Sequence, residues 1–246
     1  MLWLECHCHP VERKARAAHT WRMASVSWCA PHRPGFVTGL RAEARIAAAL
    51  GPAEAGGGLP PGAAAAAERL LTQGVSALVS FGLCGGLDPA LRPGALVVPR
   101  TVIWRGACYR ADAALSAALG GFAAEAVLAG EAAAADPAEK AKIFAATGAV
   151  AIDLESGAVA DIAARAGVPF AVLRAVCDPA EAGLPPAALA ALDAGGAVSI
   201  GAVAASLLRA PGQIPALIAL GRAAGAARAA LVGRVRDVCA GRLLVL

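Results

Sequence analysis

The fold is decided by two apolar stretches, residues 75–81 (Val-Ser-Ala-Leu-Val-Ser-Phe) and residues 168–176 (Val-Pro-Phe-Ala-Val-Leu-Arg-Ala-Val). Both stretches are short and almost continuously apolar, whereas a strand with one solvated face would alternate apolar and polar positions. They therefore predict strands that are buried on both faces, as in a parallel sheet covered by helices.

Strands and helices alternate along the chain from Gly35 onward. The expected strands are residues 36–38, 76–81, 95–99, 102–104, 126–128, 149–152 and 170–176. The expected helices are residues 41–50, 63–73, 112–119, 137–146, 155–165, 186–193, 200–208, 213–220 and 226–238. This order is typical of right-handed βαβ units. We therefore predict an α/β fold: a single domain with a largely parallel or mixed central sheet flanked by helices, and a helical C-terminal tail.

The composition indicates one ordered domain. Of the 246 residues, 58% are hydrophobic and 16% are charged, so the chain can bury enough apolar surface to offset the entropy of ordering. Residues 1–33 lack periodicity and an apolar signal segment, and we expect a poorly ordered N-terminal extension, with Met23 as an alternative start. The ordered domain is expected to span residues 34–246.

Charge and cysteine usage argue against several classes of protein. The formal net charge is +4, but no dense cluster of Lys and Arg is present, so no nucleic-acid partner is expected. The seven cysteines are scattered and odd in number, without a secretory signal, which predicts a cytoplasmic protein without a disulfide framework. Charges or Pro interrupt every apolar run before the about 18–20 residues that a spanning helix needs.

The helical tail carries its charge mainly on arginine. These residues are Arg209, Arg222, Arg228, Arg234, Arg236 and Arg242, against Asp237. They do not share one helical face, which favours a solvated exterior over a helix lying on a membrane and leaves peripheral membrane contact open.

The first candidate site segment is Ser-Phe-Gly-Leu-Cys-Gly-Gly-Leu, residues 80–87, directly after an expected strand. Its glycines, Gly82, Gly85 and Gly86, allow a sharp turn and bring backbone N–H groups close to a ligand. The segment matches neither a Walker loop nor a dinucleotide fingerprint. We expect either a ligand-binding loop or a plain turn.

The second candidate segment, Ile-Asp-Leu-Glu-Ser at residues 152–156, places two acids where a strand runs into a helix. Ligands of α/β sheets bind at such strand ends. Glu155 is predicted to project into the cleft, where its carboxylate can accept hydrogen bonds from vicinal hydroxyls. Asp153 is predicted to cap the helix, and the alternative for Glu155 is that it only completes the first turn.

The third candidate segment is Arg-Ala-Val-Cys-Asp, residues 174–178, at the end of a buried strand. Partial desolvation favours the protonated form of Asp178, as a general acid needs near neutral pH. The alternative is that Asp178 pairs with Arg174 or caps the loop. Arg174 is expected to be structural and to hold a carboxylate.

A further carboxylate, Glu43, lies in the first expected helix. It shares one helical stripe with Ile46 and Ala47. Arg41 and Arg45 share a different stripe. Glu43 is therefore predicted to face inward, with a first-turn acid that complements the helix dipole as the alternative.

Aromatic side chains and metal ligands are scarce. Phe81 and Phe144 are the candidates to stack on a base or a sugar, with burial in the core as the alternative. No metal site is expected, because no second ligand pair follows the N-terminal Cys and His residues at zinc-like spacing.

The three site segments occur in the order found in the nucleoside phosphorylase and nucleosidase superfamily, which has the purine nucleoside phosphorylase-like fold. The chain resembles that family between Gly35 and Pro179, through its glycine segment, Asp-Leu-Glu-Ser and Arg-Ala-Val-Cys-Asp. Residues 139–149 and 185–215 resemble the hopanoid-associated phosphorylase branch, which is implied to release adenine from adenosylhopane.

The resemblance implies a role for each acid. Glu155 would bind the ribose 2′- and 3′-hydroxyls and support positive charge on the sugar, and Asp178 would protonate N7 of adenine. Glu43 stands near the position where related nucleosidases carry a glutamate that activates water.

The resemblance also implies contacts and partners. Substrate contacts fall on Gly82, Gly85, Gly86 and Leu154, the last where relatives carry Met, and phosphate contacts on Arg41 and Ser80. No metal or organic cofactor is implied, and phosphate is a candidate co-substrate. The implied partners are a small nucleoside, lipid-linked in this branch, and a second copy in a homodimer.

Nucleophile and substrate stay open at this point. Related phosphorylases hold phosphate with an arginine beside the glycine segment, whereas Ser80 and Leu83 stand there in this chain. A nucleosidase for methylthioadenosine, S-adenosylhomocysteine or futalosine is one alternative. A non-catalytic nucleoside-binding relative is another, motivated by Leu83 and by the short spacing from Gly39 to Glu43.

Overall fold

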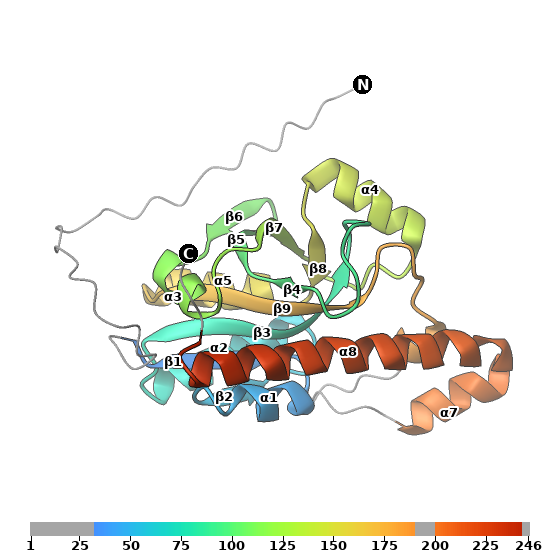
Figure 1. Cartoon of the computed structure of the whole chain (residues 1–246), viewed down its shortest axis with the longest axis horizontal. Coiled ribbons are helices and arrows are strands. Elements are labelled where there is room, and N and C mark those ends of the chain that lie inside the picture. Colours follow the sequence, from blue (N-terminus) through green and yellow to red (C-terminus); the bar gives the residue numbers. More distant parts are fainter. Residues whose placement is uncertain (1–31, 190–199, 243–246) are drawn as a thin grey trace.

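A computed structural model of the chain describes residues 32–189 and 200–242 (Figure 1). Its strands are β1 (Pro34–Thr38), β2 (Ala53–Ala55), β3 (Ala77–Gly86), β4 (Leu96–Val97), β5 (Pro99–Trp104), β6 (Ala107–Arg110), β7 (Ala124–Ala129), β8 (Ala151–Asp153) and β9 (Phe170–Asp178). Its helices are α1 (Arg41–Ala47), α2 (Pro60–Thr72), α3 (Ala113–Ala118), α4 (Pro137–Thr147), α5 (Ser156–Ala166), α6 (Pro186–Leu189), α7 (Ile200–Arg209), the 3₁₀ turn η1 (Pro211–Gln213) and α8 (Ile214–Cys239).

The described strands form one mixed sheet, in the order β2-β1-β3-β8-β7-β5-β6, with β9 paired to β3 and β4. The long strand β3 pairs parallel with β1 and β9, and its last two residues pair antiparallel with β8. In this register Gly85 lies opposite both Ile152 and Asp178. The two segments that carry Glu155 and Asp178 therefore meet at the C-terminal end of β3.

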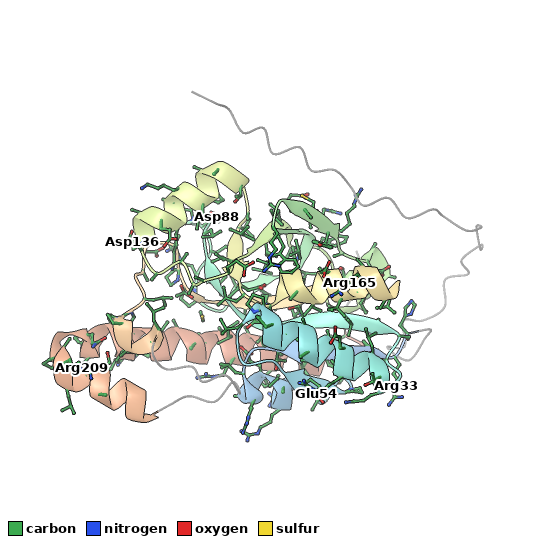
Figure 2. The ribbon with its side chains drawn as sticks, turned by 180° about the vertical axis from the view of Figure 1, so that it is seen from behind. Arg33, Glu54, Asp88, Asp136, Arg165 and Arg209 are labelled. Carbon is green, nitrogen blue, oxygen red and sulfur yellow. The ribbon has the colours of Figure 1, made fainter. Side chains whose placement is uncertain are left out.

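Side chains on alternate positions of the central strands face opposite layers of helices. Val37, Leu78 and Val172 belong to the core under α2 and α5, which lie side by side across one face in Figure 2. Phe36 and Leu173, like their neighbours on that side, belong to the core under α1, α3 and α8. Burial on both faces explains why these strands are continuously apolar.

The predicted α/β class, the central mixed sheet and the helical C-terminal tail are confirmed, but three local predictions are wrong. The short strands β2 and β6 were not expected, since three or four residues carry too little pattern to detect. Residues 82–86 are not a loop or turn after the expected strand 76–81: they continue β3 to Gly86. Residues 213–220 and 226–238 form the single helix α8, because the glycines at 221 and 225 are tolerated within an alanine-rich helix.

The C-terminal helices leave the body of the protein in an antiparallel hairpin. The C-terminal half of α8 packs on the sheet through Ala227, Leu231 and Val235. Its N-terminal half and α7 extend beyond the sheet in Figure 1, and Arg209 marks their far end in Figure 2. By length and composition alone, the helical residues Pro211–Cys239 could cross a membrane. Within the protein, 11% of their most apolar window is buried.

Parts of the predicted organisation lie outside the described residues. The expected N-terminal extension, residues 1–33, falls there except for its last two residues, as do residues 190–193 of the expected helix 186–193. The division into residues 1–33 and 34–246 stays a prediction.

Candidate active site

Four carboxyl groups line one cavity of about 220 Å³, and one of them, Asp153, ends β8. Glu43 comes from α1, Glu155 from the residue before α5, and Asp178 from the end of β9. The rest of the lining is largely aliphatic: Leu40, Leu83, Ile152, Leu154 and Leu184. A larger cavity of about 380 Å³, beside β6 and α5, contains none of the predicted site residues.

Arg174 lies beneath this cavity and joins its acidic side chains. The guanidinium is 1% exposed, and its Nη2 lies 2.8 Å from Glu155 Oε2. Its Nε lies 3.1 Å from Asp153 Oδ2 as an ion pair. Nη2 also donates to Ser80 Oγ at 2.6 Å, and Nη1 to the Leu83 carbonyl at 3.2 Å. The expectation that Arg174 is structural and holds a carboxylate is confirmed.

Asp153 caps the helix as predicted. Its Oδ1 accepts the backbone N–H groups of Glu155 at 2.9 Å and Ser156 at 2.7 Å, and Oδ2 accepts the Ser156 hydroxyl. Ser156 Oγ also lies 3.0 Å from Ser80 Oγ, where the Ser80 hydroxyl can donate because the Ser156 proton goes to Asp153. These contacts fix the turn that presents Glu155.

Glu155 is 6% exposed, and burial is the main cause that raises its pKa to about 7, against the opposing charge of Arg174. Asp153 and Glu43 raise this pKa further, because their charges repel a carboxylate. A Cβ atom at Gly39 would lie 2.5 Å from Glu155 Oε1, so only glycine leaves room for this carboxyl group.

Glu43 faces inward as predicted and is 2% exposed. Its Oε2 accepts the Leu40 N–H at 2.8 Å, so it also closes its own helix, and its Oε1 accepts the Leu83 N–H at 2.9 Å. Burial raises its pKa, and Arg174 opposes that rise. Gly82 has a φ of +154°, and a Cβ atom there would lie 2.8 Å from Glu43 Oε2.

Asp178 is paired with a lysine that the sequence analysis gave no role. The Lys140 ammonium lies 2.7 Å from Asp178 Oδ2, and the Cys177 thiol donates to Oδ1 at 3.2 Å. The alternative pairing with Arg174 is therefore wrong. Burial raises the pKa of Asp178 and Lys140 opposes the rise. A Cβ atom at Gly85 would lie 3.0 Å from Asp178 Oδ2.

One signal in the sequence points to Lys140. It shares a helical stripe with Ile143 and Phe144, at spacings of three and four residues, as Glu43 does in its own helix. Its side chain is fully buried. Lys140 and Glu43 therefore share one sequence pattern: each is a charged residue on the apolar, inward-facing stripe of its helix.

Of the remaining predicted contacts, two line the cavity and the others lie outside its lining. Gly85 and Leu154 line the cavity. Gly82 lies behind Glu43, and a Cβ atom at Gly86 would lie 3.2 Å from Val176. Ser80 is buried in the Arg174 network, and Arg41 is exposed on α1.

The aromatic candidates lie in the core. Phe81 is fully buried against Phe36, with 6.2 Å between the ring centroids. Phe144 packs against the small core that includes Leu87. Both placements favour the alternative of core burial. Within residues 32–189 and 200–242, no group of three or more His, Cys, Asp or Glu side chains is arranged to hold a metal ion.

Comparisons with known proteins agree with this fold. The model of the phosphorylase superfamily matches residues 31–125 and 105–210. No curated protein matches the chain. Among solved structures, S-adenosylhomocysteine nucleosidase from Streptococcus pyogenes has a TM-score of 0.61 at 15% identity and covers 88% of this chain and 99% of its own.

Two further solved structures share the fold. The 5′-methylthioadenosine/S-adenosylhomocysteine nucleosidase from Neisseria meningitidis has a TM-score of 0.60 at 15% identity, covering 86% of this chain and 100% of its own. Futalosine hydrolase of Helicobacter pylori has a TM-score of 0.53 at 16% identity, covering 60% of this chain and 85% of its own.

The raised pKa of Glu155 predicts a pH-dependent stability. Between the ordinary value of 4.5 and about 7, the folded protein holds a proton on Glu155 that the unfolded chain does not. This group therefore makes the free energy of unfolding fall as pH rises through that window. We expect Glu155→Gln to show a shallower fall than the wild type in urea unfolding at pH 5, 6 and 7.

A matched control is Glu181→Gln, which removes an exposed carboxylate and should keep the wild-type slope. Identical slopes for Glu155→Gln and the wild type would contradict the assignment.

Proposed function

Because the chain belongs to the phosphorylase superfamily and is an enzyme of the nucleoside phosphorylase or hydrolase type, we propose that it releases adenine from a nucleoside by cleaving the N-glycosidic bond. The observation that carries this proposal is the convergence of Glu155 and Asp178 on one cavity, from segments on opposite sides of Gly85. A nucleoside must touch both groups at once, one at its sugar and the other at its base.

Glu155 is proposed to hold the sugar. An ionised carboxylate accepts hydrogen bonds from two vicinal hydroxyls, and the oxocarbenium-like state that forms as the bond breaks is positively charged. That charge favours ionisation of a carboxyl group whose pKa is raised to about 7 in the free protein. The interaction is stronger in the transition state than in the ground state, as catalysis requires.

Asp178 is proposed to protonate N7 of the adenine, so that the base leaves neutral. Burial raises the pKa of this carboxyl group, which favours the protonated form that a general acid needs. Its place at the end of β9, across the cavity from α5, suits the base end of a nucleoside.

Glu43 is proposed to activate water as the nucleophile. It lines the cavity, and two backbone amides hold its carboxylate in place. Within the described lining of the cavity there is no Lys, Arg or His to bind a phosphate dianion. Phosphorolysis, with Arg41 and Ser80 as phosphate contacts, is the competing proposal.

The substrate is proposed to carry an apolar substituent on the ribose 5′ carbon, as adenosylhopane does, which places the enzyme in hopanoid biosynthesis. Leu40, Leu154 and Leu184 give the cavity aliphatic walls, and the branch resemblance of residues 139–149 supports the lipid. Methylthioadenosine and S-adenosylhomocysteine form the second candidate class, because the solved structures that cover 86–88% of this chain are nucleosidases of these compounds.

Peripheral contact with an anionic membrane is proposed at the end of the α7–α8 hairpin. Leu208, Ile214 and Ile218 are 86%, 44% and 50% exposed there. Arg209 and Arg222 flank them and are exposed, and no Asp or Glu occurs between residues 200 and 236. Exposed apolar side chains, beside arginines that have no acidic residue near them in the sequence, suit a surface of anionic lipid.

A cytoplasmic location and a homodimer are also proposed. The soluble nucleosidase-like fold supports the first, and the family resemblance supports the second. Sedimentation of the purified protein at several concentrations tests the dimer, and a monomer at every concentration would exclude it.

Asp178→Asn should lower the turnover for adenine release on the order of 10² or more, the usual scale for loss of a general acid. The measurement is adenine released from adenosylhopane, methylthioadenosine, S-adenosylhomocysteine and futalosine, followed by chromatography. Glu181→Gln, an exposed acid three residues away that pairs with Arg92, is the matched control and should keep full turnover. Undiminished turnover in Asp178→Asn refutes the role of Asp178.

That substrate panel also ranks the candidate classes, since the preferred compound shows the highest kcat/KM. Tight binding of adenosine without adenine release from any compound would favour a non-catalytic nucleoside-binding protein.

Adenine release should proceed at the same rate with and without inorganic phosphate, because water is the proposed nucleophile. The sugar product should be the free sugar and not its 1-phosphate, which mass spectrometry distinguishes. Release that depends on phosphate, with a sugar 1-phosphate as product, would replace hydrolysis by phosphorolysis.

The wild-type protein should sediment with vesicles that contain anionic phospholipid, and less so as salt is raised. Leu208→Glu combined with Ile218→Glu should abolish this binding. Leu59→Glu changes a 50% exposed leucine on the body of the protein and should leave it intact. Failure of the wild type to sediment, or equal loss in both variants, would contradict the docking surface.

A further inference from the structure

Lys140 is a fully buried cation next to Asp178, the proposed general acid, and it has no role in the reaction as proposed above. It lies in the N-terminal part of α4, and its ammonium meets Asp178 Oδ2 at 2.7 Å. An ammonium taken out of water is costly unless it is paired and hydrogen-bonded. Its presence beside a carboxyl group that lines the cavity calls for a physical account.

The hydrogen bonds of Lys140 limit what it can do. An ammonium has three N–H donors. Besides Asp178 Oδ2, they reach the Pro179 carbonyl at 3.0 Å and the Ala182 carbonyl at 2.9 Å. All three donors are occupied by the protein, so Lys140 has none left for a base or an anion and acts through Asp178.

The same contacts fix the Asp178 carboxyl group. Lys140 holds Oδ2, the Cys177 thiol meets Oδ1 at 3.2 Å, and Gly85 leaves just enough room on the sheet side. The Leu184 N–H also donates to the Ala135 carbonyl at 2.9 Å, so the segment before α4 is tied to the segment after β9, as Lys140 ties α4 itself. Asp178 is thus held on a braced wall of the cavity.

We propose that Lys140 is a positioning residue for the base-protonating acid: it orients Asp178 and stabilises the carboxylate that Asp178 becomes when it gives up its proton. The inference rests on the proposed function. As the N-glycosidic bond breaks, its electron pair passes to adenine, the O–H bond of Asp178 breaks and an N7–H bond forms. The carboxylate left behind faces the ammonium, and water restores its proton after adenine departs.

The charges around Asp178 define the expected pH dependence. Lys140 faces it from α4, Cys177 from β9 and Cys84 from β3. The charges of Arg174, Asp153 and Glu155 also act on Cys84, and the charge of Glu43 acts on Cys177. Of these groups, Lys140 is the one that bonds Asp178 as a cation, and its charge opposes the rise that burial causes in the pKa.

Removal of that charge should therefore raise the pKa of Asp178. A general acid must be protonated, so kcat/KM falls where pH rises above its pKa. In Lys140→Met and Lys140→Gln this alkaline limb should move to higher pH, and kcat at neutral pH should fall, because the carboxylate is less well stabilised. Lys140→Arg keeps the cation and should restore the wild-type limb.

Lys142→Met is the matched control, since Lys142 is an exposed lysine on the same helix and should leave the profile unchanged. An equal loss of kcat/KM at every pH in Lys140→Met and Lys140→Gln, with the limb in place, would show a purely structural role and overturn the proposal. An unchanged profile in both variants would overturn it as well.

A second measurement separates this inference from the proposed function. In protein labelled with ¹³C-aspartate, the Asp178 carboxyl resonance is identified by its loss in Asp178→Asn and titrated without substrate. Its pKa should be higher in Lys140→Gln than in the wild type and Lys142→Met. An equal pKa rejects the inference whatever the substrate, whereas a shifted pKa in a protein that releases no adenine rejects only the proposed function.

Discussion

The buried guanidinium of Arg174 links four elements of the fold. From β9 it reaches Asp153 at the end of β8, Glu155 at the start of α5 and Ser80 in β3, and its charge acts on Glu43 in α1. Burial lowers its pKa, but the carboxylates of Asp153 and Glu155 more than offset this, so the group stays charged. Loss of one partner from such a pair typically costs about 3–5 kcal/mol, because the other charge is left buried and uncompensated.

The balance of charge around Arg174 explains why the site is suited to a cationic transition state. One guanidinium faces three carboxyl groups within a buried region. Burial and, to a smaller extent, the charges of Asp153 and Glu43 raise the pKa of Glu155 to about 7, and a proton on this group relieves the excess negative charge. A cation that forms on a sugar beside Glu155 would supply the missing positive charge. The charges of the site therefore favour such a cation.

The placement of the acids around one cavity could be predicted from the sequence because each one follows a local pattern. Glu43 was found from its helical stripe, and Glu155 and Asp178 from their places at strand ends. The Lys140–Asp178 pair joins residues 38 positions apart, so no local pattern contains it. The glycines were misinterpreted for a related reason. A run rich in glycine is typical of a loop, but Gly82 and Gly85 lie inside β3. Glycine stands at both positions because a Cβ atom there would crowd the carboxyl groups of Glu43 and Asp178.

Each of the two buried cations holds one of the proposed catalytic acids, Arg174 the proposed sugar-binding Glu155 and Lys140 the proposed base-protonating Asp178. Arg174 is engaged by Glu155, Asp153, Ser80 and the Leu83 carbonyl, and Lys140 by Asp178 and two carbonyl groups. An incoming phosphate would have to displace carboxylates from one of these cations and then lie beside them without compensation. Water needs no such displacement, and Glu43 is an acceptor already held in place to receive its proton. The ion pairs that Arg174 and Lys140 form with the proposed catalytic acids therefore favour water over phosphate as the nucleophile.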